Sequence, residues 1–170
     1  ENADAKLSIA RAAIPYLVPN TSIFLDAGTT VMSLVRQLPN QHYTIVTSGA
    51  NIAIELSQRS RSTVSCVGGQ ISSSTLSLSG PQAEAFLATV NIDTAVLAAT
   101  GYSTGAGFTV GSYTENSLKR RVIQKADKVI LLIDRSKLGR TLPFTFASLS
   151  DIDVVICDAP LPEDFIQAAR

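Results

Sequence analysis

The sequence predicts an α/β domain in which a mostly parallel, Rossmann-like sheet is covered by helices. Short apolar runs of strand length alternate with segments of helical periodicity along the whole chain. Five of the apolar runs are followed at once by Gly, Asp, Ser or Thr, which is typical of the carboxyl ends of parallel strands. Of the 170 residues, 45% are hydrophobic and 16% are charged. We therefore expect residues 1–170 to form a single domain with a substantial core.

The first half of the chain opens with a helix and then alternates strands and helices. Leu7–Leu17 carries Ile9, Ala10 and Ala13 on one face, and Pro19 closes this predicted helix. The elements expected after it are, in order, a strand at Ser22–Leu25, a helix at Thr30–Leu38, a strand at Thr44–Val46, a helix at Asn51–Ser57 and a strand at Thr63–Val67.

The second half continues the alternation after a serine-rich stretch, Gln70–Ser79, which is expected to be an excursion or a hairpin. Whether it belongs to a pocket or to an oligomer contact stays open. The glycine-rich segment Gly101–Gly111 is expected to be a loop that could close over a ligand. The other expected elements are helices at Pro81–Thr89, Thr114–Ala126 and Pro162–Ala169, and strands at Thr94–Ala98, Lys128–Ile133 and Val154–Cys157.

Charge and hydropathy exclude several classes of protein. Fourteen basic residues balance fourteen acidic ones, so the formal net charge is zero, which argues against a stand-alone nucleic-acid binder. No apolar run approaches the roughly 20 residues that span a bilayer. The first residues also lack the basic start and apolar stretch of a secretion signal. We therefore expect a cytoplasmic protein without membrane contact.

Several kinds of catalytic or cofactor site are not supported. His42 is the single histidine and lies in a polar turn at the opposite sheet edge from the candidate pocket, so no Ser-His-Asp triad is expected. Gly105-Ala106-Gly107 lacks the third glycine and the preceding strand of a dinucleotide-binding motif. Cys66 and Cys157 lie in apolar runs and are expected to be buried, reduced thiols. We expect no metal and no cofactor.

The polar residues after the first predicted strand indicate an anion site. In Asp26-Ala27-Gly28-Thr29-Thr30, a glycine is followed by two hydroxyl side chains at the start of a predicted helix. The free amides and the positive end of a helix start favour phosphate. No Lys-Ser/Thr pair completes a P-loop, so a nucleoside triphosphate is not implied. Lys137, which follows another strand, could complete the anion pocket. Taken singly, the first segment could equally be an ordinary capped turn, and Lys137 a solvated side chain.

Six strings in register resemble the effector-binding domain of DeoR-type transcriptional regulators, over nearly all of the chain. The strings are Ile23-Phe24-Leu25-Asp26-Ala27-Gly28-Thr29-Thr30, Thr47-Ser48-Gly49-Ala50-Asn51, Val67-Gly68-Gly69, Leu78-Ser79-Gly80, Asp134-Arg135-Ser136-Lys137-Leu138-Gly139 and Ile152-Asp153-Val154-Val155-Ile156-Cys157-Asp158. The resemblance implies a fold similar to ribose-5-phosphate isomerase and related sugar-phosphate isomerases. It also implies a sensor of sugar phosphates in a transcriptional regulator that represses genes of carbohydrate metabolism.

The resemblance further implies partners and site residues. Members usually carry an N-terminal winged helix-turn-helix, which this chain lacks, so operator DNA would be bound only through that missing domain. The other implied partners are a phosphorylated sugar effector and further copies of the chain in a homo-oligomer, a dimer or tetramer. By position, the implied ligand-binding residues are Asp26, Gly28, Thr29 and Thr30 in the phosphate-side loop, Lys137 in the Asp-x-Ser-Lys motif, and Thr47, Ser48, Gly69, Gly101 and Glu115 in pocket-facing segments.

A sugar-phosphate isomerase is the alternative function. An isomerase needs a positioned base, and Glu115 is the one attractive carboxylate in the loop-to-helix region, although it could instead complete a capping box with Ser112. The related isomerases carry an Asp-rich motif after the fourth strand, where this chain has Ala98-Ala99-Thr100-Gly101-Tyr102. We therefore expect ligand sensing without turnover, and no catalytic residue.

Overall fold

The centre of the fold is a six-stranded sheet in which all neighbouring strands are parallel. The computed structural model describes residues 3–59 and 61–170. The strand order is β11-β9-β6-β1-β2-β3. The chain adds β2 and β3 on one side of β1 and then β6, β9 and β11 on the other, so the strand order reverses between β1 and β6. The strands are β1 (Ser22–Leu25), β2 (Thr44–Thr47), β3 (Thr63–Cys66), β6 (Ile92–Ala98), β9 (Ala126–Ile133) and β11 (Val154–Cys157). Ligands bind at such a reversal point, outside the carboxyl ends of the strands.

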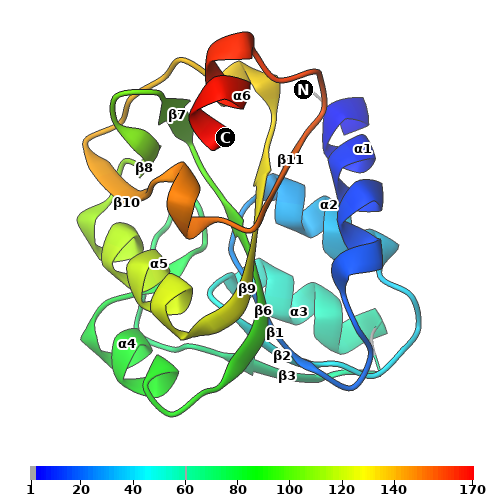
Figure 1. Ribbon diagram of the computed structural model, residues 1–170. Coiled ribbons are helices and arrows are strands. Elements are labelled where there is room, and N and C mark those ends of the chain that lie inside the picture. Colours follow the sequence, from blue (N-terminus) through cyan, green and yellow to red (C-terminus); the bar gives the residue numbers. More distant parts are fainter. Residues whose placement is uncertain (1–2, 60) are drawn as a thin grey trace.

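Helices cover both faces of this sheet, which confirms the predicted α/β class (Figure 1). One face is covered by α1 (Ala3–Ala13), α2 (Thr29–Gln37) and α3 (Ala50–Arg59), and the other by α4 (Pro81–Leu87) and α5 (Tyr113–Lys125). The remaining helical elements are α6 (Glu163–Ala169) and three short 3-10 turns, η1 (Ile14–Tyr16), η2 (Arg135–Lys137) and η3 (Leu149–Asp151). No helix in the described part of the chain is long and apolar enough to span a membrane.

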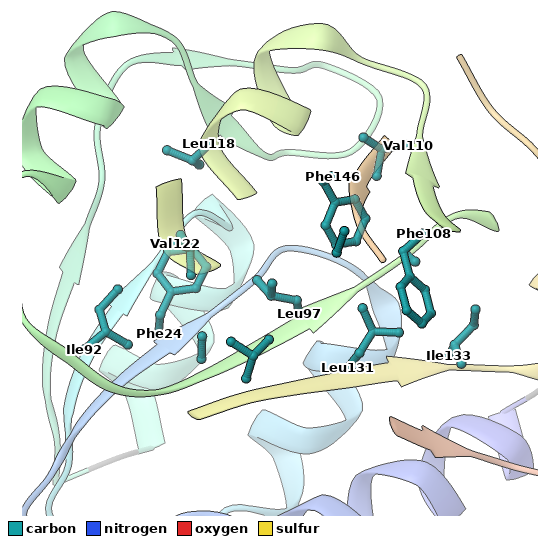
Figure 2. Packing of buried hydrophobic residues seen from close by; sticks show 14 of the residues in the cluster. Phe24, Ile92, Leu97, Phe108, Val110, Leu118, Val122, Leu131, Ile133 and Phe146 are labelled. Atoms are coloured by element: carbon teal, nitrogen blue, oxygen red, sulfur yellow. The ribbon is translucent and has the colours of Figure 1, made fainter. Parts of the chain in front are cut away.

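The central strands are apolar on both faces because each face has its own helix layer. In β1, Ile23 and Leu25 pack in the cluster under α1 and α2, whereas Phe24 packs in the opposite cluster. Figure 2 shows Leu118 and Val122 of α5 over the strand residues of that second cluster. Side chains alternate between the two faces of a strand, so a strand covered on both sides becomes a continuous apolar run. This packing explains why the central strands could be predicted from the sequence.

Two small antiparallel sheets stand beside the large one. Residues 101–111 form the hairpin β7 (Gly101–Ser103) and β8 (Gly107–Val110), so the prediction of a loop there is wrong. A third strand, β10 (Phe144–Ala147), pairs with β8 and was not predicted. The serine-rich stretch contains the hairpin β4 (Gln70–Ile71) and β5 (Leu78–Ser79), which is one of the two options left open by the sequence.

Two local predictions also need correction. The opening helix begins at Ala3 and changes to the 3-10 turn η1 after Ala13, because Pro15 has no amide hydrogen to continue an α-helix. Cys66 is exposed at the end of the edge strand β3, and Cys157 is half-buried rather than fully buried. His42 is exposed and lies 3.5 Å from the Thr63 hydroxyl at the amino end of the sheet, as expected for a surface residue.

Candidate functional site

A cavity of about 210 Å³ lies at the carboxyl ends of β1 and β6, where the strand order reverses. Its walls come from the segments after β1, β2, β6 and β9, from α1, from α5 and from the loop between β4 and β5. Pockets for drug-sized ligands occupy roughly 300–1,000 Å³, so this cavity suits a more compact ligand. Four of the five strand-end segments identified in the sequence therefore meet at this cavity, whereas Gly68-Gly69, after β3, does not line it.

The loop after β1 presents the start of α2 to this cavity. Gly28 has φ +128°, a backbone conformation that favours glycine, and α2 begins at the next residue. Met32 donates the first helical hydrogen bond, to the Gly28 carbonyl at 3.0 Å. Since the amides of Thr29 and Thr30 precede it, they have no carbonyl to bond within the helix. These amides and the positive helix end favour a negatively charged group in the cavity.

A buried ion pair lies directly beside this loop. The Asp26 carboxylate accepts a hydrogen bond from the Lys119 ammonium at 2.5 Å, and their side chains are only 6% and 10% exposed. Asp26 also accepts from the backbone amides of Ala27, at 2.9 Å, and Ala98, at 3.0 Å. Lys119 donates in addition to the Ala98 carbonyl, and its ammonium lies 4.9 Å from the ring centroid of Phe146. Asp26 therefore ties β1 to β6 and α5, and its charge is balanced.

Glu115, in the first turn of α5, is a further part of the cavity wall. Its carboxylate accepts hydrogen bonds from the Ser77 hydroxyl and, at 3.2 Å, from the Thr75 hydroxyl. Ser112 accepts from the Glu115 amide at 3.4 Å, but the Glu115 carboxylate bonds to the β4–β5 loop. Only half of the predicted capping box is thus formed.

Backbone hydrogen bonds hold the β4–β5 loop over the cavity. The Leu78 amide donates to the Ser48 carbonyl at 2.7 Å, and the Ala50 amide donates to the Leu76 carbonyl at 3.0 Å. Thr75, Ser77 and Leu78 consequently line the cavity. Part of the serine-rich stretch is therefore a wall of this pocket.

Lys137 supplies a cation to the wall of the same cavity. Asp134 is buried at the end of β9 and accepts from the Ser136 amide at 3.0 Å and from the Ser136 hydroxyl, which shapes the turn η2. That turn places Lys137 in the cavity wall. Among the residues that the structure describes, the Lys137 ammonium has no hydrogen-bonding or ion-pair partner. It is available for an anionic ligand.

Metal binding has no support in residues 3–59 and 61–170. No group of three or more His, Cys, Asp or Glu side chains in these ranges could hold a metal ion. The cavity wall itself offers amides, hydroxyls, ammonium groups and carboxylates.

Comparison with known proteins identifies the family. Residues 1–159 match the family described as the DeoR C terminal sensor domain. The chain belongs to this family. Relatives of this sensor domain include the HTH-type transcriptional regulator GlpR of Haloferax volcanii, 36% identical over 165 residues, and the regulator YulB of Bacillus subtilis, 32% identical over 167 residues. The two alignments include 96% and 98% of this chain, but only 64% and 65% of the length of the two regulators.

Solved structures show what the sensor domain resembles in fold. Ribose 5-phosphate isomerase A of Methanocaldococcus jannaschii has a TM-score of 0.61 at 18% identity, covering 84% of this chain and 57% of the isomerase. The delta subunit of eIF2B from Chaetomium thermophilum has a TM-score of 0.64 at 15% identity, covering 92% of this chain and 56% of the subunit. The predicted family and the predicted isomerase-like fold are both confirmed. The named relatives are regulators rather than enzymes, in agreement with a sensor.

The sensor domain brings seven of the ten predicted site residues into the cavity wall, and their contacts with a ligand remain predictions. The seven are Asp26, Gly28, Thr29, Thr30, Ser48, Glu115 and Lys137. The wall also contains residues that sequence reasoning missed, notably Lys6, Thr75, Ser77 and Lys119. Lys119 could have been found, because it follows Glu115 by four residues and precedes Val122 by three, which puts it on the same face of α5 as both.

The other three predicted residues support the backbone around the cavity instead of lining it. The Thr47 hydroxyl donates to the Leu25 carbonyl at 2.7 Å and accepts from the Gly49 amide at 3.0 Å. A Cβ on Gly101 would lie 2.6 Å from the Arg140 carbonyl oxygen. Gly69 has φ +94°, and a Cβ there would lie 2.4 Å from the Ser79 carbonyl oxygen. Thr47 thus links β1 to the turn after β2, and the two glycines allow close backbone approaches.

Replacing Gly69 with alanine is expected to destabilise the sensor domain by about 2–4 kcal/mol, from backbone strain and from the clash with β5. Gly68 is a matched control, since it also has positive φ (+76°) but open space at its Cβ position. Its replacement by alanine should cost only about 1–2 kcal/mol. Urea denaturation of both variants measures the difference. Equal losses would mean that the close approach to Ser79 contributes nothing.

Proposed function

We propose that this sensor domain binds a phosphorylated sugar in the cavity, and that binding alters how the full-length regulator binds its operator through a DNA-binding domain outside this chain. The observation that carries the proposal is the meeting of the free Lys137 ammonium with the start of α2, Gly28–Thr30, in one cavity wall. Amides, threonine hydroxyls and one ammonium group together provide strong donors for a phosphate dianion.

The rest of the cavity matches a polyhydroxylated ligand. The Thr75 and Ser77 hydroxyls and the Glu115 carboxylate face the cavity beyond the phosphate side. Sugar hydroxyls both donate and accept hydrogen bonds, so they can pair with a carboxylate and with side-chain hydroxyls at the same time. A compact sugar with a terminal phosphate thus fits both the size and the polarity of the site.

Sensing is favoured over turnover because the carboxylates are already engaged. Asp26 accepts from Lys119 and from two backbone amides, and Glu115 accepts from the Ser77 and Thr75 hydroxyls. These hydrogen bonds favour the charged carboxylates and make both poor proton acceptors for a substrate. The relatives include a transcriptional repressor, GlcR of Bacillus subtilis, and a putative aga operon transcriptional repressor of Escherichia coli O157:H7. We propose the same kind of role here, in a homo-oligomer that represses genes of carbohydrate metabolism.

A thermal-shift screen of pentose and hexose phosphates beside their unphosphorylated forms tests this function. A ligand at 100 times its Kd stabilises the folded state by about 2.7 kcal/mol, which should raise Tm by about 5–10 °C in a domain of this size. We expect only phosphorylated sugars to do so. Equal stabilisation by the unphosphorylated forms, or none by any phosphate, would contradict the proposal. Aldose–ketose conversion of a stabilising sugar phosphate that Glu115→Gln abolishes would favour the isomerase instead.

A further inference from the structure

Lys6 is a second unpaired cation in the wall of the proposed ligand site. It belongs to α1, whereas the rest of the phosphate side is built from α2 and η2. Within the described part of the chain, its ammonium has no hydrogen-bonding or ion-pair partner. Lys6 and Lys137 therefore place two positive charges from separate elements in the cavity wall that also contains the start of α2.

The beginning of α1 is held to the domain less firmly than its end. The buried side chains of this helix are Ile9, Ala10 and Ala13, all in its second half. Ala3 and Asp4 are exposed, and Lys6 is only half-buried. Segments with few buried apolar contacts open locally at low free-energy cost. A ligand contact at Lys6 would thus stabilise the helical conformation in the part of α1 that is held least firmly.

From this arrangement we infer that Lys6 is the third contact for the ligand's anionic group, and that through Lys6 the ligand orders the first two turns of α1. The inference rests on the proposed function. In the full-length regulator of that proposal, the DNA-binding domain precedes α1, so ordering this helix fixes the direction of the chain that enters the sensor domain. Occupancy of the cavity is coupled in this way to the position of the preceding segment, because bound and free states differ in the contacts of α1.

Hydrogen exchange with inorganic phosphate as the probe tests the inference, at ionic strength held constant with sodium chloride. In an α-helix, the amides of Leu7, Ser8 and Ile9 bond to the carbonyls of the first three residues, so they report on the first turns. We expect saturating phosphate to slow their exchange about fivefold or more in the wild type. Lys6→Gln should abolish this protection and weaken phosphate binding about tenfold, leaving measurable binding through Lys137 and α2.

The matched control is Arg11→Gln, which removes an exposed positive charge from the same helix away from the cavity wall. It should behave as the wild type in both measurements. Phosphate binding without protection of α1, or equal protection in Lys6→Gln, overturns the inference and leaves the proposed function standing. If calorimetry finds no saturable phosphate binding in the wild type, both the inference and the phosphate site are wrong.

Discussion

Replacing Lys119 with alanine is expected to destabilise the domain by about 3–5 kcal/mol, because it leaves the Asp26 carboxylate buried without its counter-charge. The lysine also bonds to the Ala98 carbonyl and lies over the Phe146 ring, so the variant loses contacts to β6 and β10 as well. Urea denaturation followed by circular dichroism measures the free energy of unfolding. This should be the largest effect of any single lysine in the chain.

Two further variants separate the buried charge from helix propensity and packing. Arg121→Gln, also in α5, breaks a pair with Glu84 in which the arginine side chain is 62% exposed, and should cost no more than about 1 kcal/mol. Combining Asp26→Asn with Lys119→Met removes both charges, and this double variant should be more stable than Lys119→Ala. A loss below about 1 kcal/mol for Lys119→Ala would contradict the importance of the pair.

The parts of the fold that sequence analysis predicted are those governed by local patterns. Phe24 and its two neighbours in β1 form an apolar run because helices cover both faces of that strand. The polar residues after each strand could be assigned to one edge of the sheet because parallel strands share a direction. Both inferences need only the period of the hydrophobic residues, the order of the elements along the chain and the right-handed connections between parallel strands.

What the sequence did not reveal depends on pairing between distant segments. The segment 101–111 is glycine-rich, yet it forms strands because β10, more than 30 residues later, pairs with β8 and packs Phe146 near Phe108. Strand propensity is set largely by such neighbours, which no local window contains. The same holds for the site, where Asp26 bonds to Lys119, 93 positions later in the sequence, and Ser77 bonds to Glu115, 38 positions later.

The buried pair also explains how an acidic residue can stand next to the proposed anion site. An unpaired carboxylate beside Gly28–Thr30 would repel a phosphate across a few ångströms of low-dielectric protein. Lys119 cancels that charge, while the two backbone amides bonded to Asp26 hold the loop in the conformation that exposes the start of α2. Asp26 is therefore expected to position the loop, in place of the direct ligand contact that the family resemblance implies, which separates its role from that of Lys137.

Replacing Lys137 with alanine is expected to weaken binding of a phosphorylated sugar by about 10- to 100-fold, the value of one hydrogen bond to a charged group. Thr30→Val, which removes one hydroxyl donor at the start of α2, should cost less, about 5- to 10-fold. Titration calorimetry with the sugar phosphate that gives the largest thermal shift measures both. Arg135→Ala is the control, since it removes the same charge from the same turn outside the cavity wall. Unchanged affinity in both Lys137→Ala and Thr30→Val would remove the basis for a phosphate site, whereas an equal loss in Arg135→Ala would indicate long-range attraction only, which added salt would screen.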